Sequence, residues 1–259
     1  MKILFIGDIV GSPGREVLAK YVPQMKSSGE ADFVIVNAEN AAGGSGITEK
    51  VAREIFANGA DVITLGDHVW DKREVYPYLT AELRILRPAN FPKDAPGHGS
   101  VIVDGPEGVK VGVVSLLGRT FVKYTTDCPF RTLDARLQEM RSITPNIIVD
   151  IHAEATSEKV AMGWYADGRV AAVLGTHTHI QTADERVLPQ GTAYITDVGM
   201  TGPYDSVIGQ IKERIIERYV TSLPCKFEVA AGKATLCGVI VDIAEQTGKA
   251  RSIVRVQKD

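Results

Sequence analysis

Short apolar runs rich in β-branched residues alternate along the chain with longer stretches whose apolar residues recur every three or four positions. Runs of the first kind predict buried strands at residues 2–7, 33–37 and 61–65. The stretches between them predict helices, with Pro13 in a first helical turn and Thr48 capping the apolar face of residues 51–56. Strands separated by helices pair in parallel, so the pattern indicates an α/β fold.

The alternation continues through the rest of the chain. Further strands are predicted at residues 99–104, 109–117, 146–151, 170–175 and 192–197, with helices at residues 133–142 and 157–166. A charged amphipathic helix at residues 207–222 is expected to be a solvated surface element or the flank of a dimer, not a catalytic element. Residues 226–256 alternate like antiparallel strands, with turns at Gly232 and Gly248. No linker interrupts the pattern, so residues 1–259 are expected to form a single domain.

Composition and charge narrow the class of protein. The 259 residues are 44% hydrophobic and 24% charged, which is typical of a globular chain. The 29 Lys and Arg residues face 32 Asp and Glu residues, and no basic run is present, so duplex nucleic acid is not an expected partner. A small phosphodiester or nucleotide substrate stays open, because bound metal ions can supply positive charge.

Cysteine usage and hydropathy indicate the compartment. The three cysteines are odd in number and form no CxxC pair, which argues against a disulfide framework. The first ten residues lack the features of a signal peptide, and no apolar run approaches the roughly 20 residues that span a bilayer. We therefore expect a cytoplasmic protein without a membrane partner.

Residue types that bind metals follow five of the predicted strands. They are Asp8, Glu39 with Asn40, Asp67 with His68, His152, and His177 with His179. The carboxyl ends of strands in an α/β sheet meet at one crevice, so we expect these side chains to converge. Four of the five histidines belong to this set, whereas His98 fits a surface loop and is left out. In extended backbone, the spacing of His177 and His179 would point both rings to the same face.

Phosphoryl hydrolysis gains from two metal ions about 3.5–4 Å apart, which share a bridging hydroxide and clamp the phosphate oxygens. Glu39 could be the bridging carboxylate, with Asp8, Asn40 and Asp67 giving oxygen ligands and the histidines giving nitrogen ligands. A mixed oxygen and imidazole set suits iron, manganese or zinc better than calcium. Taken alone, Asp8 is typical of a helix cap, and His68 and His152 of hydrogen-bonded core histidines. The combination favours a two-metal site.

These blocks resemble the calcineurin-like metallophosphoesterases, and within them the bacterial YmdB-like branch of 2′,3′-cyclic nucleotide phosphodiesterases. The motifs that carry the resemblance are IGDIVG, VNAEN, LGDHVWD, DIHAEATSEK and GTHTH, and they span nearly the whole chain. The wider superfamily has Asp-x-His in the first block, where this chain has Val10, and a bridging aspartate where this chain has Glu39. Both departures are features of the YmdB-like branch.

The resemblance implies an αββα sandwich and two divalent or mixed-valence metal ions, with iron first and manganese or zinc as alternatives. It assigns Asp8, Glu39, Asn40 and His179 to one ion. It assigns Glu39, Asp67, His152 and His177 to the other, with His68 as the catalytic proton donor and a metal-bridging hydroxide as nucleophile. A homo-oligomer is also an expectation from the family. The family usually has Asn where this chain has Asp67, and this change removes one positive charge from the site.

Two other functions remain open on the sequence. The same ligands would serve a phosphomonoesterase or a protein phosphatase. A non-catalytic, metal-dependent regulatory or RNA-associated protein could use the site for sensing. Arg119 and Arg131 lie in a long polar loop, where a solvated loop is the simpler reading and a phosphate contact the alternative.

Overall fold

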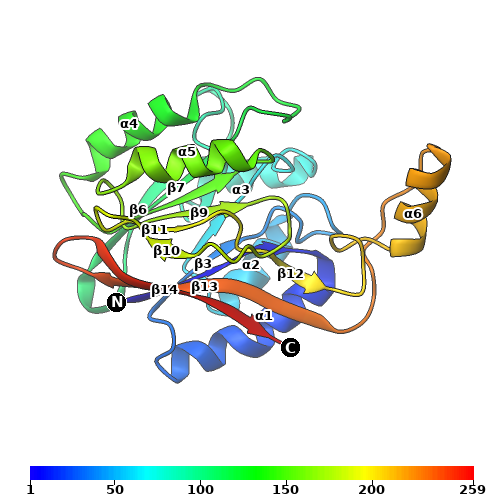
Figure 1. Cartoon of the computed structure of the whole chain (residues 1–259), viewed down its shortest axis with the longest axis horizontal. Helices are drawn as coiled ribbons and strands as arrows, with labels where there is room; N and C mark the ends of the chain where they lie inside the picture. Colours follow the sequence, from blue (N-terminus) through cyan, green and yellow to red (C-terminus); the bar gives the residue numbers. More distant parts are fainter.

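Two β-sheets pack face to face, with helices on both outer sides, in the computed structural model, which describes residues 1–259 (Figure 1). This arrangement confirms the predicted αββα sandwich. The alternation of residues along β1 (Lys2–Ile6) shows how it arises. Ile3 and Phe5 belong to the core between the sheets, whereas Leu4 and Ile6 belong to the core beneath the helices.

The first sheet joins the two ends of the chain. Parallel to β1 run β3 (Phe33–Asn37), β4 (Val62–Thr64) and β5 (Ile85–Leu86). On the other side of β1 lies the antiparallel strand β13 (Ala234–Ala244), which also pairs with β14 (Lys249–Lys258) and with β12 (Met200–Pro203). The two-residue strand β2 (Asp8–Ile9) runs parallel to β12. The C-terminal hairpin therefore stabilises the strand that leads to Asp8.

The second sheet is built from the middle of the chain. Its parallel strands are β7 (Lys110–Leu117), β8 (Ile147–His152), β9 (Ala172–Thr176) and β11 (Ala193–Ile195). Antiparallel strands β6 (Ser100–Asp104) and β10 (Arg186–Val187) form its two edges. The carboxyl ends of β8 and β9 thus lie opposite those of β3 and β4 across the inner core.

Apolar helix faces close the outer layers. Helices α1 (Gly11–Ser27) and α2 (Glu49–Ala57) cover the first sheet, and α4 (Pro129–Met140) and α5 (Thr156–Ala166) cover the second (Figure 1). The Thr48 side chain accepts a hydrogen bond from the Val51 N–H at 3.3 Å, which confirms the predicted cap of α2. Shorter elements are α3 (Tyr76–Ala81) and the 3₁₀ turns η1 (Arg73–Val75) and η2 (Pro106–Gly108). No helix is both long enough and apolar enough to cross a membrane.

The prediction of a helix at residues 207–222 was wrong in its first third. Helix α6 (Lys212–Thr221) begins only after Ile208 and Gly209, whose φ angles of 47° and 94° are incompatible with a right-handed helix. In Figure 1, α6 projects from the body of the molecule. The predicted strand region of residues 226–256 is also shorter, because pairing begins only at Ala234, while the turn at Gly248 is confirmed.

Candidate metal centre

All eight predicted site residues lie together at the carboxyl ends of β1, β3, β4, β8 and β9. Two glycines make this convergence possible. A Cβ on Gly7 would lie 1.8 Å from the Gly199 carbonyl oxygen, so only glycine lets β1 pass there and deliver Asp8. A Cβ on Gly66 would lie 2.2 Å from Glu39 Oε2, so the residue before Asp67 must also be a glycine.

Four side chains form the tightest group. One ligand atom from each of Glu39, Asp67, His152 and His177 lies within 4.8 Å of the others. His152 Nε2 is 3.1 Å from Glu39 Oε2, 3.4 Å from Asp67 Oδ1 and 3.0 Å from His177 Nδ1. These are the four residues that the family resemblance assigns to one ion. They come from both sheets, so the group forms only when the two sheets pack.

The other predicted group adjoins the first through Glu39. The Asn40 side-chain amide lies 3.1 Å from Glu39 Oε1 and 3.2 Å from His179 Nε2. Asp8 Oδ2 accepts a hydrogen bond from the His177 backbone N–H at 3.1 Å, which leaves Asp8 Oδ1 free. Glu39 therefore has one carboxylate oxygen near each group, as a bridging ligand requires.

Each of three histidines has an acceptor on its outer nitrogen. His152 Nδ1 is 2.8 Å from Thr176 Oγ1, His177 Nε2 is 3.1 Å from Glu154 Oε2, and His179 Nδ1 is 2.9 Å from the Ile208 carbonyl oxygen. Because the outer nitrogen donates its proton to that acceptor, the inner nitrogen can keep a free lone pair. This is how proteins orient metal-binding imidazoles.

The ionisation of the site reflects crowded carboxylates. Burial raises the pKa of Asp8 to about 6, although His152 and His179 act in the opposite direction. Burial would also raise the pKa of Glu39, but the charge of His152 outweighs it and the pKa is lowered. The pKa of His152 is raised by Glu39 and Asp67 against the effect of burial. A proton on His152 thus supplies part of the positive charge that these carboxylates require.

The residues fit metal ions better than they fit one another. Asp8 Oδ1 and Asp67 Oδ1 are buried without any hydrogen-bond partner. An unpartnered buried carboxylate oxygen costs free energy unless a cation reaches it. The donor set of carboxylates, one amide and imidazoles is the set preferred by iron, manganese and zinc.

His177 and His179 converge for a different reason from the one predicted. Their backbone is not extended, because φ is 100° at His177 and 67° at His179. Non-glycine residues rarely adopt such angles, and strained backbone of this kind clusters at functional sites. The two rings therefore point to different groups: His177 toward His152 and His179 toward Asn40.

Comparison with known proteins agrees with this geometry. The family model described as "YmdB-like protein" matches residues 4–256. The chain belongs to the YmdB-like family. One relative, the 2′,3′-cyclic-nucleotide 2′-phosphodiesterase of Bacillus subtilis (strain 168), is 53% identical over 99% of this chain and 96% of its own length. The YmdB-like resemblance is thereby confirmed.

Solved structures of similar proteins share the whole fold. A hypothetical protein from Thermus thermophilus is 40% identical, with a TM-score of 0.93 over 100% of this chain and 99% of that one. A structure titled as a novel phosphatase from Mycoplasma pneumoniae is 34% identical, with a TM-score of 0.93 over 100% and 93% of the two chains. The sandwich seen here is the fold of this YmdB-like group.

A cavity of about 570 Å³ opens from the metal-ligand side chains. Its inner wall includes Glu39, Asn40, His68, His177 and His179. Its outer wall is formed by α6 and its flanking segments, through Val207, Ile208, Gln210, Ile215, Arg218, Tyr219 and Phe227. The expectation that this segment is only a solvated or dimer-flanking element is therefore incomplete, since α6 lines the cavity of the site.

The two loop arginines do not line this cavity. The Arg119 side chain is exposed, and its backbone N–H donates to Glu158 Oε1 at 3.0 Å. Arg131 lies in the first turns of α4 and lines a separate cavity together with His98. The structure therefore gives no phosphate contact at the metal-ligand cluster to either arginine.

Sequence reasoning missed the buried groups that hold the ligands. Asp150 is fully buried and accepts hydrogen bonds from Thr64 at 2.6 Å, Thr176 at 2.7 Å and Asn37 at 3.0 Å. Thr176 Oγ1 donates to Asp150, so it must accept from His152 Nδ1, and this fixes the tautomer of the ring. A signal was available, because Asp150 and His152 are two residues apart on a strand and so share a face.

A second missed device is a buried ion pair behind the His177–His179 turn. Lys159 on α5 is 0% exposed, and its Nζ lies 2.9 Å from Asp197 Oδ2 and 3.1 Å from the Thr176 carbonyl oxygen. The same Asp197 oxygen accepts from the Thr178 N–H at 3.0 Å and its hydroxyl at 2.7 Å. The pair thus holds the strained turn in place.

We expect Lys159→Met to lower the free energy of unfolding by about 3–5 kcal/mol, because it leaves the buried Asp197 carboxylate unpaired. Urea denaturation checks this value. The double variant Lys159→Met/Asp197→Asn should recover part of the loss, since it removes the uncompensated charge. Equal stability of Lys159→Met and the unmodified chain would contradict the role given to the pair.

Proposed function

We propose that this protein is a two-metal phosphodiesterase that hydrolyses 2′,3′-cyclic nucleotides. The observation that carries the proposal is the joint cluster of Glu39, Asp67, His152 and His177 beside Asn40 and His179, with Glu39 shared between the two groups. The name of the Bacillus subtilis relative supports the substrate class, because that protein is a 2′,3′-cyclic-nucleotide 2′-phosphodiesterase. Iron is the proposed metal, with manganese or zinc as alternatives.

Asp8, Glu39, Asn40 and His179 would hold one ion, and Glu39, Asp67, His152 and His177 the other. Two such ions supply a hydroxide nucleophile near neutral pH and positive charge for the phosphate oxygens. Because the ligands come from both sheets, we also propose that residues 1–259 act as one domain.

His68 is the proposed proton donor to the leaving oxygen. Its ring is 32% exposed and lines the cavity, whereas its Nδ1 lies 2.7 Å from Asn40 Oδ1 and its backbone N–H donates to Glu39 Oε2 at 3.3 Å. If Asn40 gives its oxygen to a metal, its NH₂ group turns toward His68 Nδ1. His68 Nδ1 would then accept, and Nε2 would carry the proton. Cleavage of the bond from phosphorus to O2′ needs a proton at that oxygen.

Specificity for diesters can be tested with two matched substrates. We expect metal-loaded protein to hydrolyse 2′,3′-cyclic AMP and bis-p-nitrophenyl phosphate much faster than p-nitrophenyl phosphate. The reverse order would favour the phosphomonoesterase alternative, which the names of the Mycoplasma relatives keep open as "putative phosphatase/phosphodiesterase". Inactivity with every substrate would favour a binding or regulatory role.

The carboxylate at Asp67 should tighten metal binding and weaken the attraction of the anionic substrate. Asp67→Asn removes a buried negative charge whose Oδ1 has no other partner. We therefore expect weaker metal retention in the presence of a chelator and a lower KM for 2′,3′-cyclic AMP once metal is restored. Unchanged metal content together with unchanged kinetic constants would contradict this role.

A further inference from the structure

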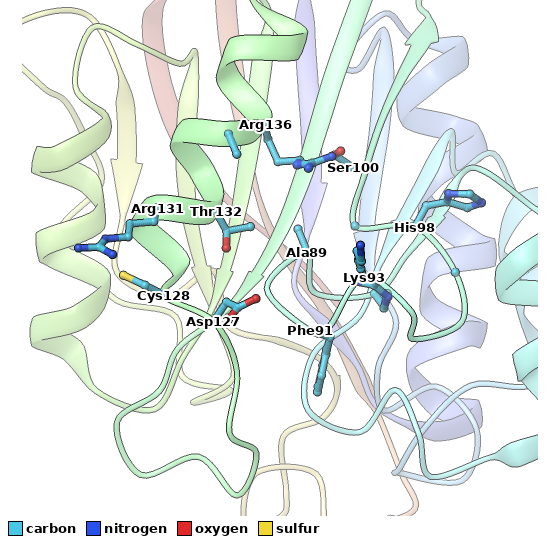
Figure 2. A pocket seen from close by; sticks show the side chains of 14 residues that line it. Ala89, Phe91, Lys93, His98, Ser100, Asp127, Cys128, Arg131, Thr132 and Arg136 are labelled. Atoms are coloured by element: carbon cyan, nitrogen blue, oxygen red, sulfur yellow. The ribbon is translucent and has the colours of Figure 1, made fainter.

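A second cavity, of about 590 Å³, lies apart from the metal-ligand side chains (Figure 2). It opens between the segment that joins β5 to β6 and the N-terminal half of α4. Its lining contains four cationic residues, Arg87, Lys93, Arg131 and Arg136, and a single carboxylate, Asp127. The two cavities share no lining residue.

The cationic groups of this cavity are poorly neutralised. Arg87 is only 5% exposed, and its guanidinium donates to backbone carbonyls alone, including those of Pro88 at 2.8 Å and Pro96 at 3.2 Å. No carboxylate lies within ion-pair distance of Arg87, Lys93 or Arg131. A buried guanidinium without a carboxylate is costly, and an external anion would compensate it.

Two of the cations act on each other across the cavity. Burial lowers the pKa of Arg87, and the nearby positive charge of Arg136 lowers it further. In Figure 2, Arg136 reaches from α4 toward Ser100, while Lys93 comes from the segment between β5 and β6. Arg136 pairs with Glu139 at 2.9 Å, but both side chains are at least one-third exposed, so this pair is weak and can exchange.

The start of α4 adds backbone donors. Its N-cap residue, Cys128, makes no side-chain capping bond, and Pro129 at the first helical position has no N–H. The N–H groups of Phe130 and Arg131 therefore have no acceptor within the helix, and the positive end of the helix dipole faces the same region. Thr132 contributes a hydroxyl to the lining.

We propose that this cavity is a second ligand site, which binds the dianionic phosphate group of a small organic phosphate. Four cations, free N–H groups and a hydroxyl match a phosphate group, and the cavity is within the size range of sites for small molecules. Binding there is independent of the metal centre, because no residue of the cavity touches the metal-ligand cluster.

The probe is phenylphosphonate, a dianion whose carbon–phosphorus bond is not an ester and is not hydrolysed. Calorimetric titration of the metal-loaded protein should show two binding events per chain, one of them at the metal centre. We expect Arg136→Gln/Lys93→Gln to weaken one event by about tenfold or more. Turnover of 2′,3′-cyclic AMP should be unchanged, since neither residue lies at the metal centre.

The matched control is Arg141→Gln/Lys50→Gln, which removes the same charge at positions outside both cavities. It should retain both events. A single binding event in the unmodified protein, or two unaltered events in Arg136→Gln/Lys93→Gln, would overturn the proposal. Inorganic phosphate should bind the second site more weakly than phenylphosphonate, and equal affinities would overturn the assignment to an organic phosphate.

Discussion

Glu39→Gln is expected to lose metal from both groups and to lower kcat/KM for 2′,3′-cyclic AMP by at least about 10³-fold, since the two-metal contribution is removed. The physical reason is that Glu39 is 1% exposed and has one oxygen near each ligand group. A neutral amide cannot bridge two cations through two anionic oxygens. Metal analysis and steady-state kinetics on the same preparation check the result.

The control for this variant is Glu49→Gln, which neutralises an exposed carboxylate on α2. It should keep both the metal content and the activity. If Glu39→Gln retained two metals per chain and normal turnover, Glu39 would not be a bridging ligand, and the proposed division of the ligands would be wrong.

His68→Ala is expected to keep its metals and to lose about 10²–10⁴-fold in kcat, the usual contribution of a positioned general acid. The loss should depend on the leaving group. The O2′ alkoxide needs a proton, whereas nitrophenolate leaves readily without one. Turnover of bis-p-nitrophenyl phosphate should therefore fall much less than turnover of 2′,3′-cyclic AMP.

A structural role for His68 would lower the two activities by the same factor, and this outcome would contradict the proton-donor assignment. His98→Ala is the matched control, because His98 lies outside the metal-ligand cavity and its ring contacts the Thr80 carbonyl oxygen at 3.3 Å. It should leave both activities unchanged.

The long strands could be predicted because burial fixes their pattern. The predicted strand at residues 33–37 coincides with β3, and all five of its residues are buried. The strands β2, β5, β10 and β12 were missed, since two to four residues are too few to show a period. Helix α6 was predicted too long, because the amphipathic pattern does not register the positive φ at Ile208 and Gly209.

The site could be predicted in its membership but not in its support. Polar residues after strands converge by topology alone, and the structure brings all eight of them together. The strained turn at His177 and His179 depends on Asp197 and Lys159, which are distant in sequence. A lysine on a helix is ordinarily exposed, so nothing in the sequence indicates that Lys159 is buried.

The measurement that tests the central claim most directly is a metal titration of the demetallated protein, with turnover of 2′,3′-cyclic AMP followed at each step. The account predicts that activity rises only as the second equivalent of iron or manganese binds, because both ligand groups must be filled. Full activity with one equivalent, or binding of two equivalents without any hydrolysis, would contradict it.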